Sequence, residues 1–251
     1  VWLRNDWAWK GKKATGELRA IDSNVIGIEC DSLAARSLFF DGSPELLFTD
    51  NETNHERLFG TVNPSPFVKD GINDYVVNGK IEAVNPNKTG TKASANYKIV
   101  IPARSEVTLR MRLTDQQFER RAAKSGKRTS NPFIDFDAIF EKRISEADEF
   151  FGNIAPAGLS EDARSVQRQA FAGMLWSKQF YHYVVREWLE GDPAMPKPPD
   201  SRSEGRNTDW SHLHNSDIIS MPDKWEYPWY AAWDLAFHCI PLAVVDPEFA
   251  K

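Results

Sequence analysis

Alternating apolar and polar residues predict β structure in the first part of the chain. The clearest case is the segment 106–114, in which every second residue is apolar: Val107, Leu109, Met111 and Leu113. A period of two places these side chains on one face of a strand, so we expect them to face a core and the residues between them, including Arg110 and Arg112, to face solvent. Shorter strands are predicted over residues 25–30, 37–40, 45–48 and 97–101. Several short strands separated by turns are typical of a β-sandwich.

Helical spacing replaces this alternation after residue 130. Asn131 can cap a helix, and apolar residues then recur at intervals of three and four up to Gly152. A second helix is predicted from Ser160 to about Leu189, and a third from about Pro228 to Val244. Between the last two, residues 191–217 are rich in Pro, Ser, Gly and Arg and are predicted to form a loop.

Strands followed by helices predict a multidomain α+β protein rather than a sheet with alternating strands and helices. We expect residues 1–115 to form part of a β-sandwich domain and residues 159–251 to begin a helical domain. Residues 116–158 would form a linker and a linker helix. The linker is basic between residues 120 and 128, but no aromatic residue interrupts the charges, so a solvated linker is favoured over a nucleic-acid-binding patch.

Charge and composition narrow the range of partners. The formal net charge of −5 argues against general affinity for nucleic acid. No apolar run approaches the length of a membrane span, so no membrane partner is expected. Cys30 and Cys239 are too few and too far apart in sequence for a disulfide framework, which favours a reducing, cytoplasmic location. The chain begins at Val1 without an initiator Met and ends at Lys251 just after an apolar run, so we expect a piece of a longer protein.

The segment from Met221 to His238 combines many large rings with charged groups. Sugar rings present apolar C–H faces that stack on aromatic side chains, and hydroxyl groups that need fixed polar partners such as carboxylates. The candidate sugar-binding residues are Trp225, Glu226, Trp229, Tyr230, Trp233, Asp234 and His238. A buried helix with a few satisfied polar groups is an equally good interpretation of the same residues.

Other candidate sites are weaker. His212 and His214 have a spacing that can chelate a metal, but no Cys or carboxylate pair completes a site, so no metal is expected. Residues 50–54 are rich in oxygen ligands but lack the glycine and spacing of a calcium loop, so we interpret them as a turn that packs on the helical domain. No glycine-rich phosphate loop or nucleophile motif occurs, and no cofactor is expected.

Four segments resemble a known family of enzymes. Residues 46–60, 68–77, 173–182 and 221–238 are similar to bacterial glucosidase-like proteins of glycoside hydrolase family 63, which includes the processing mannosyl-oligosaccharide glucosidases and the mannosylglycerate hydrolases. The resemblance implies an N-terminal β-sandwich followed by an (α/α)6 toroid of six α-hairpins, and an inverting α-glycosidase that acts on an oligosaccharide or glycoside. This chain would hold the end of the sandwich and the first helices of the toroid, and its partner would be the rest of the toroid in the same polypeptide.

The resemblance also assigns roles within the aromatic segment. Residues 230–238 are similar to an early Trp–Asp motif in which Trp233 and Asp234 would hold the non-reducing sugar. The catalytic acid and base would then lie beyond Lys251, with Asp234 as the fallback general acid. We therefore predict a fragment of an inverting α-glycosidase that is inactive by itself. The alternative is a non-catalytic carbohydrate-binding or interaction module.

Overall fold

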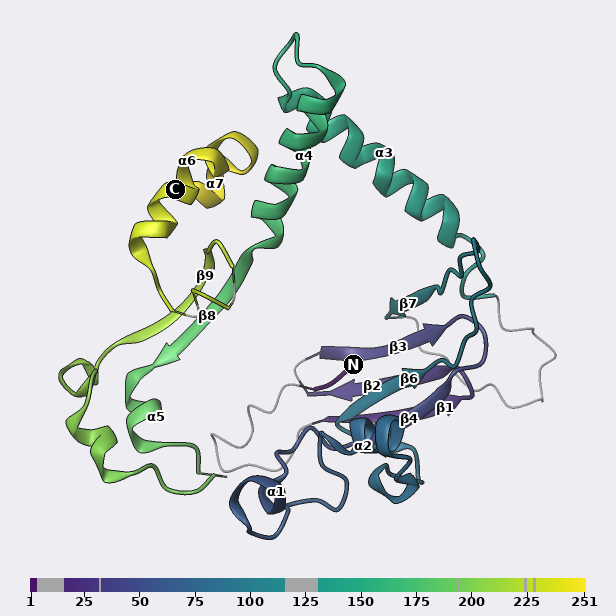
Figure 1. Cartoon of the computed structure of the whole chain (residues 1–251), viewed down its shortest axis with the longest axis vertical. Helices are drawn as coiled ribbons and strands as arrows, with labels where there is room; N and C mark the ends of the chain where they lie inside the picture. Colours follow the sequence, from purple (N-terminus) through teal and green to yellow (C-terminus); the bar gives the residue numbers. More distant parts are fainter. Residues whose placement is uncertain (4–15, 32, 116–130, 194, 224, 228) are drawn as a thin grey trace. The chain divides into compact units, whose positions relative to one another are not determined.

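The computed structural model describes residues 1–3, 16–31, 33–115, 131–193, 195–223, 225–227 and 229–251 (Figure 1). The basic residues of the predicted linker, 120–128, lie outside the described residues. The chain divides into two compact units. Unit 1 contains Val1–Phe136 and Asp192–Pro196, and unit 2 contains Asp137–Gly191 and Lys197–Lys251. Antiparallel sheets and helices occur together, so the prediction of an α+β protein is confirmed.

The strands of unit 1 form two antiparallel sheets. The larger sheet has the order β5-β1-β2-β3-β7, with strands Thr89–Gly90, Gly16–Asp22, Val25–Cys30, Leu33–Phe40 and Met111–Thr114. The second sheet pairs β4 (Glu45–Thr49) with β6 (Lys92–Asn96). The strands predicted near residues 25–30, 37–40 and 45–48 are therefore confirmed, whereas the strand predicted over 97–101 is wrong, because β6 ends at Asn96.

One hydrophobic cluster joins the two sheets of unit 1. The larger sheet contributes the buried side chains Leu18, Ile26, Ile28 and Phe40, and the β4–β6 pair contributes Leu46, Phe48 and Ala93. Phe48 is completely buried in this cluster. The alternation in β1, β2 and β4 thus supplies one shared core, because every second side chain of a strand lies on the same face.

Strand β7 confirms only residues 111–114 of the strand predicted over 106–114, because residues 106–110 form no strand. Met111 is opposite Phe40 and Leu113 is opposite Leu38, so these apolar side chains lie on the face that was predicted to be buried. Met111 is nevertheless 50% exposed and Leu113 60% exposed. The physical reason is that β7 is an edge strand of the sheet, and the described part of the β4–β6 pair does not cover it.

The arginine face of the same segment is covered instead. Arg110 donates through Nε to Asp41 at 2.8 Å, and its guanidinium lies 5.5 Å from the centre of the Phe133 ring. Arg112 donates to Asp135 at 2.6 Å and lies over the ring of Phe136. The expectation that both arginines face solvent is therefore wrong, because aromatic rings from the segment 133–136 pack on them.

Between β4 and β6 the chain forms two short helices rather than a plain loop. They are α1 (His55–Phe59) and α2 (Gly71–Asn78), followed by the 3-10 turn Ile81–Ala83. The side chain of Asn54 caps α1 by accepting a hydrogen bond from the backbone N–H of Arg57 at 3.0 Å. At Gly71 a Cβ atom would lie 2.2 Å from the backbone oxygen of Ala83, so only glycine allows α2 to start this close to the following turn.

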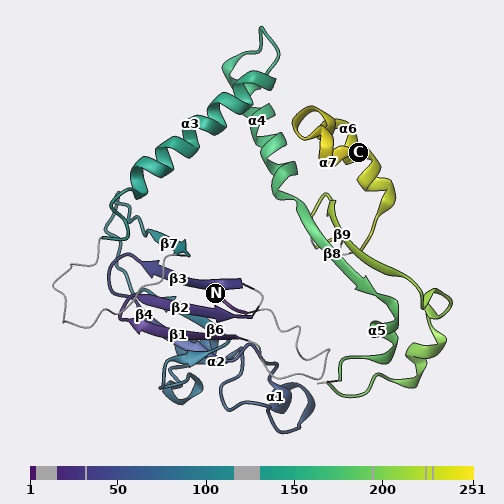
Figure 2. The ribbon, with the colours of Figure 1, turned by 180° about the vertical axis from the view of Figure 1, so that it is seen from behind.

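The described part of unit 2 contains helices and an antiparallel pair of strands, β8 and β9, seen from behind in Figure 2. A long connection joins the two strands, and the pair is called the β8–β9 hairpin below. Its elements are α3 (Phe136–Ile154), α4 (Glu161–Trp176), β8 (Lys178–Val184), α5 (Val185–Glu190), β9 (His214–Ser220), α6 (Ala232–Val245) and α7 (Pro247–Ala250). Ser160 caps α4 as predicted, since its Oγ accepts a hydrogen bond from the N–H of Ala163 at 3.2 Å. Two 3-10 turns, Asp200–Glu204 and Thr208–Trp210, lie within the predicted loop 191–217.

The single helix predicted from Ser160 to Leu189 is wrong for residues 178–184, which interrupt it before helix returns in α5. Residues 178–184 form β8, and each of its seven residues is paired with one of β9, from Lys178 with Ser220 to Val184 with His214. The reason is that Phe180, Tyr181, Tyr183 and Val184 are residue types that favour strands, and a partner strand is available to them.

Candidate functional site

The aromatic segment is held by a small core on the β8–β9 hairpin of unit 2. Ile219, Met221 and Ala231 are buried together, and Tyr181, Tyr227 and Leu235 pack against them. Met221 and Ala231 lie on either side of the turn that carries residues 225–227, 229 and 230, so burying both returns the chain to the hairpin before α6 begins. This arrangement fixes the base of the turn and leaves its tip in solvent.

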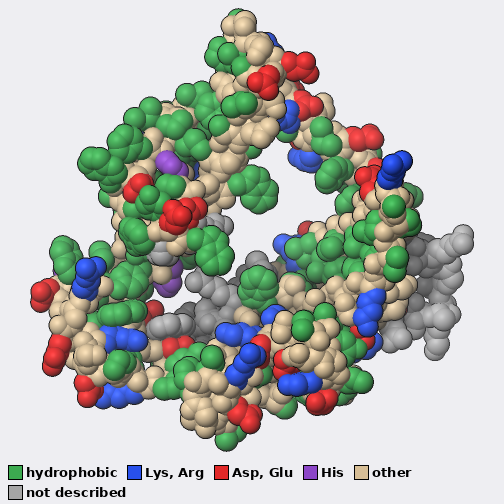
Figure 3. Space-filling model, in the orientation of Figure 1, with side chains coloured by type: hydrophobic (Ala, Val, Ile, Leu, Met, Phe, Trp, Pro, Cys, Tyr) green, Lys and Arg blue, Asp and Glu red, His purple; other side chains and the backbone are tan. Residues whose placement is uncertain are grey.

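The predicted tryptophans lie at the surface. The exposed fractions are 92% for Trp225, 50% for Trp229 and 77% for Trp233. Figure 3 shows hydrophobic side chains gathered over the region of α6 and the β8–β9 hairpin. The interpretation of this segment as a buried helix is therefore wrong for these rings, and the segment presents them to solvent as a sugar-stacking surface would require.

Three of the predicted rings, Trp229, Tyr230 and Trp233, each lie against a neighbouring ring. Tyr230 meets Tyr181 of β8 edge to face, with 5.9 Å between ring centres. Trp229 lies 5.7 Å from Tyr227, and Trp233 lies 5.7 Å from Phe237 one turn further along α6. Each ring is thus positioned by a second ring while part of its own surface remains open.

Asp234 and His238 are one helical turn apart near the start of α6. Asp234 is half-buried, and its carboxylate has no hydrogen-bonding partner among the described residues. His238 is oriented by Ser220, whose Oγ lies 3.0 Å from Nδ1 of the imidazole. Ser220 is completely buried at the end of β9, so this contact fixes the histidine ring relative to the hairpin.

Asp223 organises the turn that carries Trp225 and Glu226. Its Oδ1 accepts hydrogen bonds from the backbone N–H groups of both residues, at 2.7 Å and 2.6 Å. The carboxylate of Glu226 is exposed and has no partner in the described part of the chain. The roles of Asp223 and Ser220 were missed from the sequence; an Asp two residues before the first Trp is a turn signal that could have indicated the former.

The structure distributes the predicted residues over two neighbouring places rather than around one enclosed cavity. Trp225, Glu226, Trp229 and Tyr230 belong to the turn, and Trp233, Asp234 and His238 belong to the first two turns of α6. The arrangement can stack on a sugar ring and accept hydrogen bonds from hydroxyl groups. Among the described residues of the first two turns of α6, Asp234 is the one carboxylate, so this helix start does not by itself supply the pair of carboxyl groups that glycoside hydrolysis requires.

An ion pair fastens α6 to the hairpin. Lys178, the first residue of β8, donates to Asp246 at 2.6 Å, and its ammonium lies 3.9 Å from the centre of the Phe249 ring. Asp246 follows α6 and caps α7 by accepting from the N–H of Phe249. The bond from Lys178, and then the bond from Phe249, holds the pKa of the Asp246 carboxyl below its usual range.

We expect the ion pair to make stability depend on pH. Because the folded-state pKa of Asp246 is lower than the unfolded value of about 4, the carboxylate stabilises the fold above that pH, and this contribution is lost as the pH falls through the folded pKa. Asp246→Asn should therefore lower the urea midpoint at pH 7, while the difference from the parent chain should shrink below about pH 4. Glu248→Gln, which removes a more exposed ion pair with Lys251, is the matched control and should have little effect at either pH. An equal difference at both pH values would contradict the expectation.

The two histidines with chelating spacing lie against different rings. His214 meets His182 across the hairpin with ring centres 5.8 Å apart, while His212 lies 5.8 Å from Trp210. Within the described ranges, no group of three or more His, Cys, Asp or Glu side chains is placed to hold a metal ion. In the same ranges, none of the helices is both long and apolar enough to cross a membrane.

Comparison with known proteins finds one extensive similarity. A protein of Saccharomyces cerevisiae named "Uncharacterized protein YMR196W" is 49% identical over 214 residues, which cover 84% of this chain and 20% of the yeast protein. The chain thus spans about a fifth of the length of this curated relative. No family model matches the chain, and no solved structure matches it.

Proposed function

We propose that this chain is the sugar-holding part of an inverting α-glycosidase similar to glycoside hydrolase family 63. The observation that carries the proposal is the surface on unit 2 where exposed tryptophans lie beside Asp234, a carboxylate with no hydrogen-bonding partner among the described residues. An aromatic ring can stack on the C–H face of a sugar, and a carboxylate can accept hydrogen bonds from two of its hydroxyl groups. His238, oriented by buried Ser220, offers a further polar contact.

The reaction itself needs groups from a longer polypeptide. Inversion requires a carboxylic acid that protonates the leaving oxygen and a carboxylate that activates water, with about 6.5–9.5 Å between them. In the proposal both come from residues beyond this chain, and Asp234 holds the sugar. The proposed partner is therefore the remainder of the same protein, in agreement with the much greater length of the yeast relative.

The proposed architecture is a β-sandwich followed by the first helices of an (α/α)6 toroid. The hydrophobic cluster shared by the two sheets of unit 1 supports the sandwich. The helices of unit 2 support the toroid, because α6 continues beyond Trp233 with exposed apolar residues at helical spacing, namely Phe237, Ile240 and Val244. Such a stripe is typical of a helix that packs against another helix.

The full-length protein should hydrolyse an α-linked disaccharide such as maltose and release the β-anomer first. Proton NMR of the fresh product reports the anomer before mutarotation, and the 251-residue chain alone should show no turnover. No hydrolysis of α-glucosides or α-mannosides by the full-length protein would contradict the proposal. Initial release of the α-anomer would contradict inversion.

Two tryptophan variants test the role of the surface. Trp233→Ala in the full-length protein should raise the dissociation constant for a disaccharide by about tenfold or more, because a stacked ring is lost. Trp176→Ala is the matched control, since Trp176 is 84% exposed on α4 and is not a candidate sugar contact. Titration calorimetry measures both constants, and equal losses in the two variants would count against a specific role for Trp233.

A further inference from the structure

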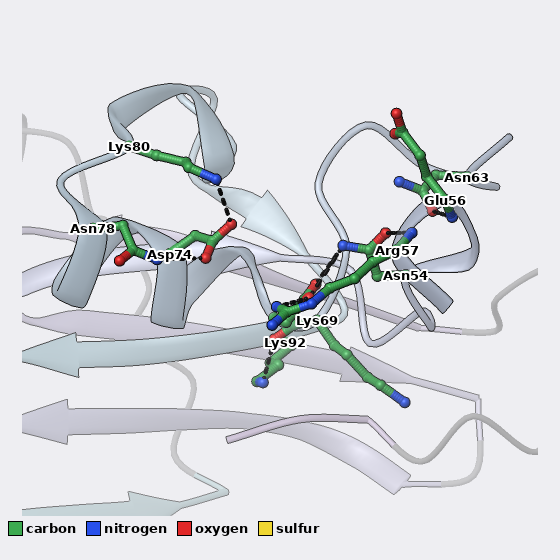
Figure 4. Close-up of polar contacts among 10 residues, drawn as sticks. Asn54, Glu56, Arg57, Asn63, Lys69, Asp74, Asn78, Lys80 and Lys92 are labelled. Carbon is green, nitrogen blue, oxygen red and sulfur yellow. Dashed lines mark hydrogen bonds and ion pairs between the residues drawn. The ribbon is translucent and has the colours of Figure 1, made fainter. Parts of the chain in front are cut away.

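A polar pocket lies between α1 and α2 in unit 1, apart from the aromatic segment. It has a volume of about 440 Å³. Figure 4 shows its residues in two groups, one around α1 and one at the end of α2. The lining consists of Asn54, Glu56, Arg57, Asp74, Asn78 and Lys80. Every one of these side chains is polar, so a ligand there would be held by hydrogen bonds and charge rather than by apolar contact.

Hydrogen bonds fix the α1 side of the pocket. Asn54 Nδ2 donates to both oxygens of Asp70, at 3.2 Å and 3.1 Å, and Arg57 donates to Asp70 Oδ2 at 3.2 Å. The oxygen of the same Asn54 amide caps α1, so all of its polar atoms are engaged. Asn54 and Arg57 are therefore held in place before any ligand arrives.

The α2 side is fixed in a similar way. Asp74 accepts hydrogen bonds from Asn78 Nδ2 at 2.9 Å and from Lys80 Nζ at 3.2 Å. The bonds from Lys80 and then Asn78 lower the pKa of Asp74, so it remains ionised and keeps both partners oriented at neutral pH.

The segment around Lys69, which lies between α1 and α2 in the sequence, is held by hydrogen bonds. The backbone N–H of Lys69 donates to the oxygen of Glu52 at 2.9 Å, and Lys69 Nζ donates to Thr53 at 3.0 Å. Lys92 of β6 donates to the backbone oxygen of Lys69 at 2.6 Å, which ties the segment to the sheet. Hydrogen bonds thus tie the segment beside the pocket to residues 52–53 and to β6.

Several hydrogen-bonding groups of the lining remain unused. The carboxylate of Glu56 and the side-chain oxygen of Asn78 have no hydrogen-bonding partner among the described residues. Arg57 and Lys80 each use one nitrogen toward an aspartate and retain further N–H donors. The pocket therefore offers both acceptors and donors, as a hydroxyl group requires, since each hydroxyl donates one hydrogen bond and accepts others.

The charges of the lining identify the class of ligand. Two carboxylates, Glu56 and Asp74, balance two cations, Arg57 and Lys80. A phosphate would require an excess of positive charge and a metal ion an excess of negative charge. From these observations we infer that the pocket binds a neutral polyhydroxylated ligand, such as a sugar unit. This inference does not depend on the proposed function of the aromatic segment.

Maltose and inorganic phosphate are suitable probes for the test. The 251-residue chain, labelled with 15N and carrying Trp233→Ala to weaken the other surface, is titrated with each compound. Maltose should shift the side-chain amide signals of Asn54 and Asn78 in a saturable way, and phosphate should not. Absence of saturable shifts with maltose, or saturable shifts with phosphate instead, would overturn the inference. Shifts in the parent chain confined to residues 225–238 would overturn it while leaving the proposed function intact.

Substitutions in the pocket lining test which side chains bind the sugar. Glu56→Gln keeps the shape but removes a charged acceptor, and should weaken maltose binding at the pocket by about tenfold, as expected for a hydrogen bond to a charged group. Asn78→Ala should also weaken it. Glu82→Gln, an exposed glutamate in the 3-10 turn outside the lining, is the matched control and should leave the affinity unchanged. Because Glu56 is exposed, the variant should fold, and an unchanged affinity in Glu56→Gln would contradict the assignment.

Discussion

Under the proposed glycosidase function, Asp234→Asn in the full-length protein should lower kcat/KM for a natural disaccharide by about ten- to several-hundred-fold. The substitution keeps the size of the side chain but replaces a charged acceptor with a neutral amide, and hydrogen bonds to a charged group are worth about 1.5–3 kcal/mol. Much of the loss should fall on kcat, because contacts to sugar hydroxyls strengthen as positive charge develops in the transition state. Steady-state kinetics of the purified variant measures the effect.

A glycosyl fluoride separates the two possible roles of Asp234. Fluoride leaves with little protonation, so removing a general acid should largely spare this substrate, whereas removing a sugar-holding residue should impair both substrates alike. Comparable losses on the fluoride and the disaccharide are the expected result. Near-normal hydrolysis of the fluoride beside a dead disaccharide reaction would make Asp234 the acid.

Phe48→Ala should reduce the free energy of unfolding by about 3–5 kcal/mol, because it leaves a cavity in the core shared by the two sheets. Phe48 is completely buried, and the chain offers a matched control in Phe59, which is 44% exposed at the end of α1. Phe59→Ala should cost much less, since little buried volume is lost there. Urea unfolding with the slope held common to both variants gives the comparison. Similar losses would mean that the two sheets do not share a tightly packed core.

Local patterns in the sequence predicted where helices and strands occur better than they predicted what packs against them. Capping by Ser160 and the approximate course of α3 and α6 followed from residues that are close together in the chain. The end of α4 could not be predicted in this way, because the strand that follows it, β8, is stabilised by β9, which begins well after β8 in the sequence. The pattern in residues 106–114 gave the correct two faces of β7, but which face is covered depends on rings of the segment 133–136.

In the candidate site, too, local sequence signals were informative and long-range contacts were not predicted. The sequence located the aromatic segment, because rings and charges are concentrated there, but it left burial open. Trp225 and Trp233 are exposed, whereas Met221 and Ala231 on either side of the turn are buried on the hairpin. The contact between Ser220 and His238 joins a strand to a helix and has no signal in the local sequence. Residues 50–54 carried a turn signal, but the pocket beside them also needs residues from α2.

The long connection between β4 and β6 has a consequence for the order of folding. Glu45 and Asn96, which are 51 positions apart, face each other in this ladder. The ladder can therefore form only by closing a long loop that contains α1 and α2. Closing a loop of that length costs chain entropy before any contact compensates it, and domains dominated by such distant pairings fold slowly. The β1–β2 pair is joined by a short turn and carries no such cost. Unit 1 should therefore form its β1–β2 hairpin first, and the pocket between α1 and α2 should take shape only when β6 finds β4.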